Sequence, residues 1–203
     1  MGSYSDASPA LPFMTDNEYN EAVSIVEATA KALEGYKGVL YGQFMLTASG
    51  PKIVEFNARF GDPEAMNTLP VLETPLIDVL VAAREGNRLP DLEVAPQATV
   101  CKYAVPEGYP DDPASGTAIE IDPESAGDVL VFYASVDGRD DGIYTTASRA
   151  VAVVGIADSI SEAEEVVDDA LSVADDGLRV RHDIGKPDLV QARIDHMAEL
   201  RDD

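Results

Sequence analysis

The sequence is poor in several residue types on which common functions depend. It has no tryptophan, one cysteine and two histidines among 203 residues. A single cysteine, Cys101, excludes an intramolecular disulfide and a zinc site built on several cysteines. We interpret it as a small buried hydrophobic side chain in the apolar run 99–105. Neither a Cys–His pair nor a Gly-x-Ser-x-Gly motif is present, so no covalent nucleophile is indicated.

Long apolar runs are also absent. No run approaches the roughly 20 residues needed to cross a bilayer. The first residues, Met1–Asp6, lack the basic and apolar regions of a signal peptide. We therefore expect a soluble, cytoplasmic protein. Apolar residues nevertheless make up 45% of the chain, which allows one large or two small domains with hydrophobic cores.

Positive charge is scarce. The chain has 14 lysine and arginine residues against 38 acidic ones, which gives a net charge of −24. Such a surface repels nucleic acids and anionic membranes, so neither is an expected partner. The acidic residues recur along the whole chain and do not form one tail. Because salt screens the repulsion between them, we hypothesise a halophilic source.

The first part of the chain predicts helices around one β-hairpin. Thr15-Asp-Asn-Glu18 matches a capping box, in which the side chains at both ends bond to the backbone of the helix start. Two β-rich runs flank the turn Ala48-Ser-Gly-Pro51 and predict a hairpin. The expected elements are a loop over 1–14, a helix from Thr15 to Gly35, strands over 38–47 and 51–57, a helix beginning at Pro63, and a helix over 74–85.

The character of the sequence changes after a linker at 89–96. Short β-rich runs follow one another, separated by glycine, proline and aspartate turns. We expect strands at 98–105, 117–121, 128–136, 142–146 and 149–156, and helices over 161–174 and 188–201. The fold class is therefore α+β, with two domains that we place at 1–94 and 95–203.

One stretch of the hairpin carries a candidate active site. Glu55, Asn57 and Arg59 lie at alternate positions of a run that begins as a strand, so their side chains are expected on one face. Two oxygen ligands and a guanidinium on one face suit a hard metal ion that carries phosphate groups. The alternating neighbours Val54, Phe56 and Ala58 are expected to face the core.

Plainer interpretations of these residues exist. In so acidic a protein, Glu55 and Asn57 could belong to an ordinary solvated strand face. Arg59 could form a weak surface ion pair with Asp62 or Glu64. Both acids would also be favourable at a helix start, since the helix dipole attracts negative charge there. The residues alone leave these alternatives open.

The same stretch carries a resemblance. Glu55–Met66 contains Arg-Phe-Gly-Asp-Pro-Glu and is similar to the signature of the phosphoribosylamine–glycine ligase family, also called glycinamide ribonucleotide synthetases. Three further stretches resemble the same family in the same order: Met1–Pro9, Tyr36–Thr47 and Arg181–Lys186. The resemblance covers essentially the whole chain and corresponds to the C-terminal half of the family's sequence.

The family is one of ATP-grasp ligases, so the resemblance implies both a fold and a reaction. Residues 1–94 would be the C-terminal half of an ATP-grasp catalytic domain, and 95–203 a small β-rich α+β C-terminal domain. The implied reaction joins glycine to 5-phosphoribosylamine with ATP, through an acyl phosphate. It gives glycinamide ribonucleotide, ADP and phosphate in de novo purine synthesis. The implied cofactor is Mg²⁺ or Mn²⁺.

The resemblance also assigns roles to individual residues. Glu55 and Asn57 match ligands of the metal ion that bridges the ATP phosphates. Arg59 and Asp62 match positions that line the reacting phosphate and the substrate carboxylate. The matches on the substrate side are Gly2, Ser3, Tyr4 and Gly61.

The sequence departs from the family in ways that keep other functions open. It has no glycine-rich phosphate loop. Gln43 and Phe44 stand where many ATP-grasp enzymes have a third acidic ligand. Lys102 lies outside the motif, on an expected strand, and is interpreted as structural. The alternatives are a non-catalytic fragment or subunit that needs a separate N-terminal half, and another ATP-grasp carboxylate–amine ligase or carboxylase.

Overall fold

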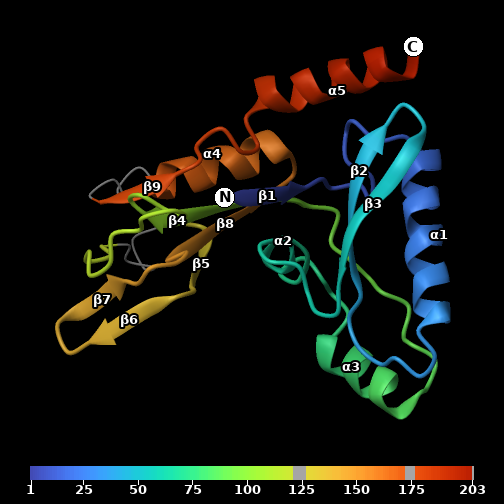
Figure 1. Ribbon diagram of the computed structural model, residues 1–203, viewed down its shortest axis with the longest axis horizontal. Coiled ribbons are helices and arrows are strands. Elements are labelled where there is room, and N and C mark those ends of the chain that lie inside the picture. The colour runs from blue at the N-terminus through green and yellow to red at the C-terminus, as the bar shows by residue number, and fades with distance from the viewer. Residues whose placement is uncertain (121–126, 172–176, 203) are drawn as a thin grey trace. The chain divides into compact units, whose positions relative to one another are not determined.

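The structure, a computed structural model, describes residues 1–120, 127–171 and 177–202 (Figure 1). These residues form two compact units. We call the first the sheet unit; it comprises Met1–Ala7 and the described part of Gln97–Leu189. The second, the hairpin unit, comprises Ser8–Pro96 and the helix residues from Val190 on. Helices and antiparallel sheets are mixed in the chain, which confirms the predicted α+β class.

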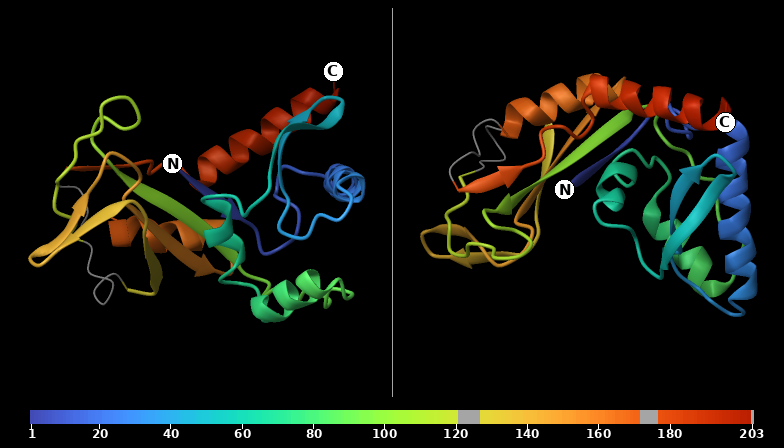
Figure 2. Two further views of the ribbon diagram at one scale, coloured as in Figure 1. Left: turned by 60° about the horizontal axis from the view of Figure 1, so that its bottom comes forward. Right: turned by 45° about the horizontal axis from the view of Figure 1, so that its top comes forward.

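The sheet unit is built on one antiparallel sheet. Its central strand, β4, is buried along its entire length, which explains the nearly continuous apolar sequence of this run. Helix α4 packs on the sheet with a buried stripe that includes Ala163, Val167 and Leu171, as predicted (Figure 2). The strands, in the order β1–β4–β8–β5 with β9 also paired to β4, are β1 (Gly2–Ser5), β4 (Ala98–Pro106), β8 (Val151–Ala157), β5 (Val129–Tyr133) and β9 (Leu178–Val180).

Two short strands share one edge of β4. Strand β8 takes the other edge, from Ala98 to Ala104. Strand β1 pairs antiparallel with the first half of β4, where Gly2 lies opposite Lys102. Strand β9 pairs with the last residues, where Val180 lies opposite Ala104. The prediction of a loop over 1–14 was therefore wrong at Gly2–Ser5, and β9 was not predicted, because each strand exists only through its pairing with β4.

The rest of the sheet unit corrects two further predictions. The expected strand at 128–136 is divided into β5 and β6 (Val136–Arg139), and β6 forms a hairpin with β7 (Gly142–Thr145). At 117–120, the described part of the expected strand 117–121, the structure has only an isolated bridge from Ala118 to Tyr144. Helix α4 spans Ile160–Leu171, and the end of the predicted helix, at 172–174, lies outside the described residues.

The hairpin unit contains the predicted capped helix and hairpin. Helix α1 (Asp16–Ala32) begins with the expected capping box between Thr15 and Glu18. Arg201 donates two hydrogen bonds to the Glu18 carboxylate, at 2.7 and 3.1 Å, and so ties the C-terminal helix to α1. The other elements are β2 (Tyr41–Thr47), β3 (Gly50–Asn57), α2 (Glu64–Thr68), α3 (Leu76–Glu85) and α5 (Pro187–Asp202).

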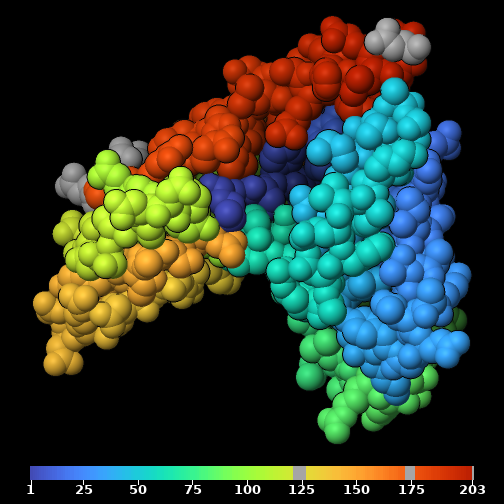
Figure 3. Space-filling model, viewed as in Figure 1, coloured from blue at the N-terminus to red at the C-terminus, as the bar shows by residue number. Residues whose placement is uncertain are grey.

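Several apolar side chains of the hairpin unit are exposed to solvent. Val54 is 56% exposed and Phe56 38%, and Ala58 is exposed as well, so the prediction that these three face the core was wrong for this chain. Ile77 on α3 is 65% exposed. Figure 3 shows the hairpin at the molecular surface, in cyan beside the blue α1. None of the described helices combines the length and the apolar character that a membrane span requires.

Candidate active site

The register of the hairpin places the motif residues. In the β2–β3 pair, Asn57 lies opposite Tyr41 and Glu55 opposite Gln43. The register then shifts, because Phe44 lies opposite Ile53, and Val54 is left as the extra residue of a bulge. The bulge comes before Glu55, so the alternation from Glu55 to Asn57 is regular and puts both side chains on one face.

Glu55 and Asn57 are in direct contact. The Asn57 amide nitrogen Nδ2 donates a hydrogen bond of 2.7 Å to Oε1 of Glu55. Glu55 is exposed and Asn57 half-buried, so solutes can reach both. Arg59 follows the end of β3, and its Nη1 donates to the carbonyl oxygen of Phe60 at 2.9 Å. The structure therefore brings together the two predicted metal ligands and leaves Arg59 exposed two residues further on.

Tyr41 joins this group, although the sequence analysis did not select it. Burial raises the pKa of Tyr41 to about 12, and the carboxylates of Glu64, its hydrogen-bond partner, and Glu55 add to the shift, whereas Arg59 opposes it. The phenol therefore keeps its proton at neutral pH and serves as a hydrogen-bond donor to Glu64. The hairpin register was the signal that could have found it, because Tyr41 lies directly opposite Asn57.

The turn after β3 is packed too closely for a side chain at Gly61. A Cβ atom there would lie 2.5 Å from Oε2 of Glu64 and 2.9 Å from the ring of Tyr41. Gly61 is buried, and Asp62 is exposed in the turn that leads into α2. Glycine at this position lets the turn press against the Tyr41–Glu64 pair. Gly61 thus packs against the Tyr41–Glu64 pair, and Asp62 is the next residue of the same turn.

Gly2, Ser3 and Tyr4, the other predicted substrate residues, belong to the sheet unit, where they form most of β1. A Cβ atom at Gly2 would lie 2.1 Å from the carbonyl oxygen of Cys101 and 3.1 Å from the side chain of Ile184. Gly2 is therefore required for the close approach of β1 to β4 and to the segment before α5.

The residue types around Glu55 fit a metal ion with few protein ligands. Within the described ranges, no three histidine, cysteine, aspartate or glutamate residues are grouped as a metal site. Glu55 and Asn57 offer a carboxylate and an amide oxygen, and Gln43 lies directly across from Glu55 with a second amide. Mg²⁺ commonly takes one or two protein oxygens and fills its shell with water and phosphate. The donor set fits that kind of site.

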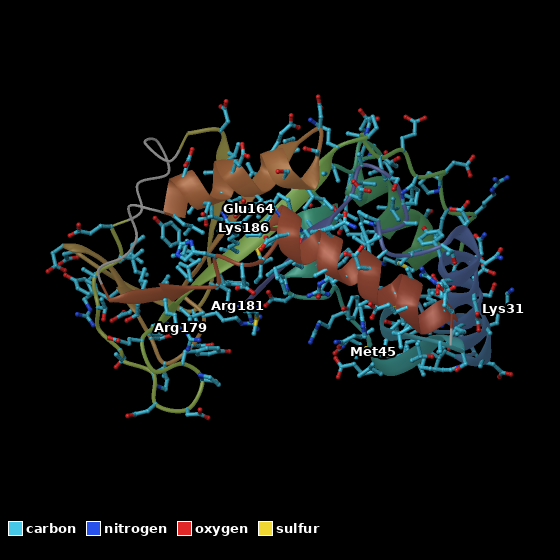
Figure 4. All side chains as sticks on the ribbon, turned by 90° about the horizontal axis from the view of Figure 1, so that it is seen from above. Lys31, Met45, Glu164, Arg179, Arg181 and Lys186 are labelled. Carbon is cyan, nitrogen blue, oxygen red and sulfur yellow. The ribbon has the colours of Figure 1, made fainter. Side chains whose placement is uncertain are left out.

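A second group of charged residues lies in the sheet unit. Lys102 is fully buried, and its Nζ contacts Oε1 of Glu164 at 2.5 Å, Oδ1 of Asp168 at 2.9 Å and the carbonyl oxygen of His182 at 2.9 Å. Lys186 contacts the same two carboxylates at 2.9 and 3.0 Å, and Figure 4 shows Glu164 and Lys186 side by side. These five residues, Lys102, Glu164, Asp168, His182 and Lys186, are called the lysine cluster below.

The lysine cluster balances its own charge. Burial would raise the pKa of Asp168, but hydrogen bonds from His182, Lys102 and Lys186 outweigh it and hold that pKa far below its usual range. Hydrogen bonds from Glu164 and Asp168 raise the pKa of Lys186. Two ammonium groups thus face two carboxylates. The arrangement supports the interpretation of Lys102 as a structural residue that anchors α4 and the 181–186 segment to β4.

Solved structures define the class of this fold. The chain is similar to phosphoribosylamine–glycine ligase from Thermotoga maritima, with a TM-score of 0.71 and 25% identity over 91% of this chain and 46% of that one. It is also similar to the biotin carboxylase domain of 2-oxoglutarate carboxylase from Hydrogenobacter thermophilus, with a TM-score of 0.63 and 18% identity over 96% of this chain and 42% of that one. The fold is therefore that of the ATP-grasp proteins.

Sequence comparisons identify the family within that class. Residues 1–65 match the ATP-grasp (A) domain of phosphoribosylglycinamide synthetase, and residues 99–187 match its C domain. Phosphoribosylamine–glycine ligase from Methanobrevibacter smithii is 50% identical over 98% of this chain, and the enzyme from Methanocaldococcus jannaschii is 49% identical over 99%. The chain belongs to the phosphoribosylglycinamide synthetase family. It spans about half the length of these relatives, 47% of each.

Proposed function

We propose that this chain supplies part of the catalytic machinery of a phosphoribosylamine–glycine ligase. The reaction would join glycine to 5-phosphoribosylamine with ATP and release ADP and phosphate. The contact between Glu55 and Asn57 in the family's signature motif is the observation that carries this proposal. The high identity to curated ligases over nearly the whole chain supports it.

Glu55 and Asn57 would hold the divalent ion, Mg²⁺ or Mn²⁺. The other oxygen of the Glu55 carboxylate, Oε2, and the amide oxygen of Asn57 are suitable hard ligands on one face of the strand. A carboxylase domain of the same fold has been solved with MgADP, which agrees with this use of the fold. When bound, the ion would offset the negative charge of the ATP phosphates during acyl phosphate formation.

Arg59 would also offset negative charge at the reacting groups. Acyl phosphate formation brings an anionic carboxylate toward an anionic phosphate, and a positioned guanidinium offsets their repulsion. Tyr41, protonated at neutral pH, would hold Glu64 and so keep the Gly61–Asp62 turn in place beside the strand pair. Gly2, Ser3 and Tyr4 would contribute to substrate binding from β1. No covalent intermediate with the protein is required.

The proposal includes a partner that carries the other half of the enzyme. The relatives that match are about twice as long as the part this chain spans. The exposed apolar side chains of the hairpin unit, among them Val54, Phe56 and Ile77, fit a surface that the remaining part of the protein covers. A complementary N-terminal half is therefore expected to be needed for activity.

Reconstitution tests the proposal. The chain would be mixed with a separately expressed N-terminal half of the Methanobrevibacter smithii enzyme, and phosphate release from ATP would be measured with glycine and 5-phosphoribosylamine. We expect release that depends on glycine and on both halves. Glu55→Gln should lower the rate on the order of a hundredfold or more, because a metal ligand is lost.

Glu73→Gln is the matched control, since Glu73 is an exposed carboxylate of the same unit outside the motif. It should leave the rate unchanged. Bicarbonate-dependent release without a requirement for glycine would instead favour a carboxylase. Full activity of Glu55→Gln would contradict the assigned metal site.

A further inference from the structure

The C-terminal helix α5 has one inward face within the hairpin unit. Its residues from Val190 on belong to that unit, and the match to the family's C domain ends at residue 187, where α5 begins. Met197 is buried, and Val190 and Ile194 are half-buried, whereas most other residues of this part of α5 are exposed. Together with Arg201, these positions recur at helical spacing and so share one face. Helix α5 therefore packs within the hairpin unit along a stripe that ends at Arg201.

Arg201 joins α5 to the start of α1. Its Nη2 donates to Oε2 of Glu18 at 2.7 Å and to the carbonyl oxygen of Phe13 at 2.8 Å. Its Nε donates to Oε1 of Glu18 at 3.1 Å. Both carboxylate oxygens thus accept from one planar guanidinium, which is the geometry of a strong ion pair. Figure 2 shows the C-terminal end of α5 beside the start of α1, in its right-hand view.

The Glu18 carboxylate lies on the inward face of α1. Glu18 is only 9% exposed, and carboxylates are seldom so buried unless they are paired. Ala22, Ile25 and Val26 follow it at helical spacing and are half-buried, so they belong to the same face. Without Arg201, this largely buried charge would lose the counter-charge that Arg201 supplies, and the start of α1 would shift to bring the carboxylate into water.

Helix α1 lies against both strands of the hairpin. A Cβ atom at Gly42 on β2 would lie 3.2 Å from Cγ2 of Val26 and 3.3 Å from the ring of Phe56. At the hairpin turn, a Cβ atom at Gly50 would lie 2.8 Å from Oε2 of Glu21. The two glycines therefore let the hairpin approach α1 closely, and a shift of α1 is transmitted to β2 and β3 because close-packed groups move together.

The contact with α1 lies directly behind the motif residues. Gly42 and Phe56 are opposite each other in the β2–β3 pair and so share one face. Phe56 stands between Glu55 and Asn57 in β3, and alternation along the strand puts those two side chains on the other face. Helix α1 thus supports the hairpin from the reverse side of the two proposed metal ligands.

We infer that Arg201, at the end of the chain, is a positioning residue for the divalent ion proposed at Glu55 and Asn57. Arg201 fixes Glu18 and with it the start of α1, and α1 holds the reverse face of the hairpin through Val26. Groups that orient metal ligands affect metal affinity although they do not touch the ion. The inference rests on the proposed function, because it concerns the ion proposed there.

Amide hydrogen exchange of the intact chain tests the link from α5 to the hairpin, without ATP, metal or a second half. Arg201→Gln should lower the protection of amides 41–43 and 55–57 about fivefold, less than the full effect of a lost charge-assisted hydrogen bond, because the change reaches the hairpin through α1. Protection in α3, in the same unit, should change less.

Arg88→Gln is the matched control, since it removes the same charge from an exposed pair with Asp91 in the same unit. It should leave the protection of the hairpin unchanged. Unchanged protection of the hairpin in Arg201→Gln, or an equal loss in α3, would overturn the inference, because the effect would then be absent or would be a general loosening of the unit.

Binding of Mn²⁺ measures the effect on the ion itself. It would be followed by electron paramagnetic resonance in the complex of this chain with the separately expressed N-terminal half and ATP. Arg201→Gln should weaken Mn²⁺ binding about tenfold, the lower end of the range for groups that orient metal ligands. In the phosphate-release assay it should raise the Mg²⁺ concentration needed for half the maximal rate and leave the maximal rate unchanged. A lower maximal rate with an unchanged Mg²⁺ requirement would show loss of folded protein and contradict the inference.

Glu18→Gln separates the ion pair from other effects of Arg201. It should weaken Mn²⁺ binding to a similar extent, and the double variant should bind no more weakly, because both changes remove one interaction. Additive losses, or unchanged Mn²⁺ binding by Arg201→Gln in an enzyme with glycine-dependent phosphate release, would remove this inference and leave the proposed function intact. If Glu55→Gln bound Mn²⁺ as well as the unchanged chain, the proposed metal site would fall, and the inference with it.

Discussion

At the scale of single residues, Lys102 has a fully buried ammonium group, whose charge must be compensated by neighbouring groups. An unpaired charge in a protein interior costs several kcal/mol, so Lys102 depends on the carboxyl groups of Glu164 and Asp168 beside it. These two acids lie on α4, and His182, whose carbonyl oxygen also accepts from Lys102, precedes α5. One side chain on the central strand thus connects three separate segments of the sheet unit.

Lys102→Met should therefore destabilise the sheet unit by about 3 kcal/mol, at the lower end of the range for breaking a buried ion pair, because Lys186 still partners Glu164. Urea unfolding followed by circular dichroism measures this change, and amide exchange in β4 locates it. Lys31→Met provides the control, since the ion pair of Lys31 with Glu27 is exposed. Equal stability of the two variants would contradict the structural role of Lys102.

Residue-level prediction succeeded where local geometry was sufficient. Alternation along a strand was enough to place Glu55 and Asn57 on one face. It was not enough to find Tyr41, whose place opposite Asn57 depends on a hairpin register that includes a bulge. The buried role of Lys102 was suggested only by its position on an apolar strand, and its partners are 62 and more residues away in the sequence.

At the scale of elements, the capping box at the start of α1 combines local and distant interactions. Thr15 Oγ1 accepts from the N–H of Glu18, and the Glu18 carboxylate accepts from the N–H of Thr15 and from Arg201. Hydrogen bonding to Arg201 and Thr15 lowers the pKa of Glu18, against the opposing effect of burial. The start of α1 is thus fixed both by its own sequence and by α5.

Thr15→Ala should cost about 1 kcal/mol of stability in the hairpin unit, because the helix loses its side-chain cap. Ser24→Ala is the matched control: the Ser24 hydroxyl bonds to the carbonyl oxygen of Asn20 inside the same helix, where alanine is favourable. Thermal unfolding of both variants gives the comparison. A loss for Ser24→Ala as large as for Thr15→Ala would show that the cap itself contributes nothing.

Elements with strong local signals were predicted, and those made by distant pairing were not. Helices α1, α3 and α5 and the β2–β3 hairpin have capping, periodicity or turn signals of their own. Strands β1 and β9 have four and three residues and no apolar alternation long enough to identify them. They form because β4 offers a free edge, which is a property of the assembled sheet.

At the scale of the whole molecule, the charge of −24 predicts sensitivity to salt. Repulsion among the acidic side chains opposes the compact state, and raising the ionic strength from 0.1 to 1 M shortens the screening length from roughly 10 to 3 Å. We expect the urea midpoint of the chain to rise with KCl over this range. Sucrose, which has no charge, serves as the comparison for general solvent effects. An unchanged midpoint would argue against the hypothesis of a halophilic source.

The division of the chain into 1–94 and 95–203 stays a proposal for the intact protein. The compact units of this structure follow a different division, because β1 belongs to the sheet unit and the end of α5 to the hairpin unit. Composition changes along the sequence could indicate the boundary near 95, where the linker over 89–96 ends. Composition could not indicate that Met1–Ala7 belong to the sheet unit and the residues from Val190 on to the hairpin unit. That assignment depends on which distant strand or helix each segment contacts.

The edge shared by β1 and β9 has a consequence for biosynthesis. Gly2 leaves the ribosome long before Ala98. Strand β1 therefore has no β4 to pair with until more than ninety further residues have emerged, and β9 emerges later still. Contacts between segments so distant slow folding and leave intermediates exposed. Strand β1 must therefore remain without its partner while the intervening residues are synthesised, and this edge of the sheet is complete only after β9 has emerged.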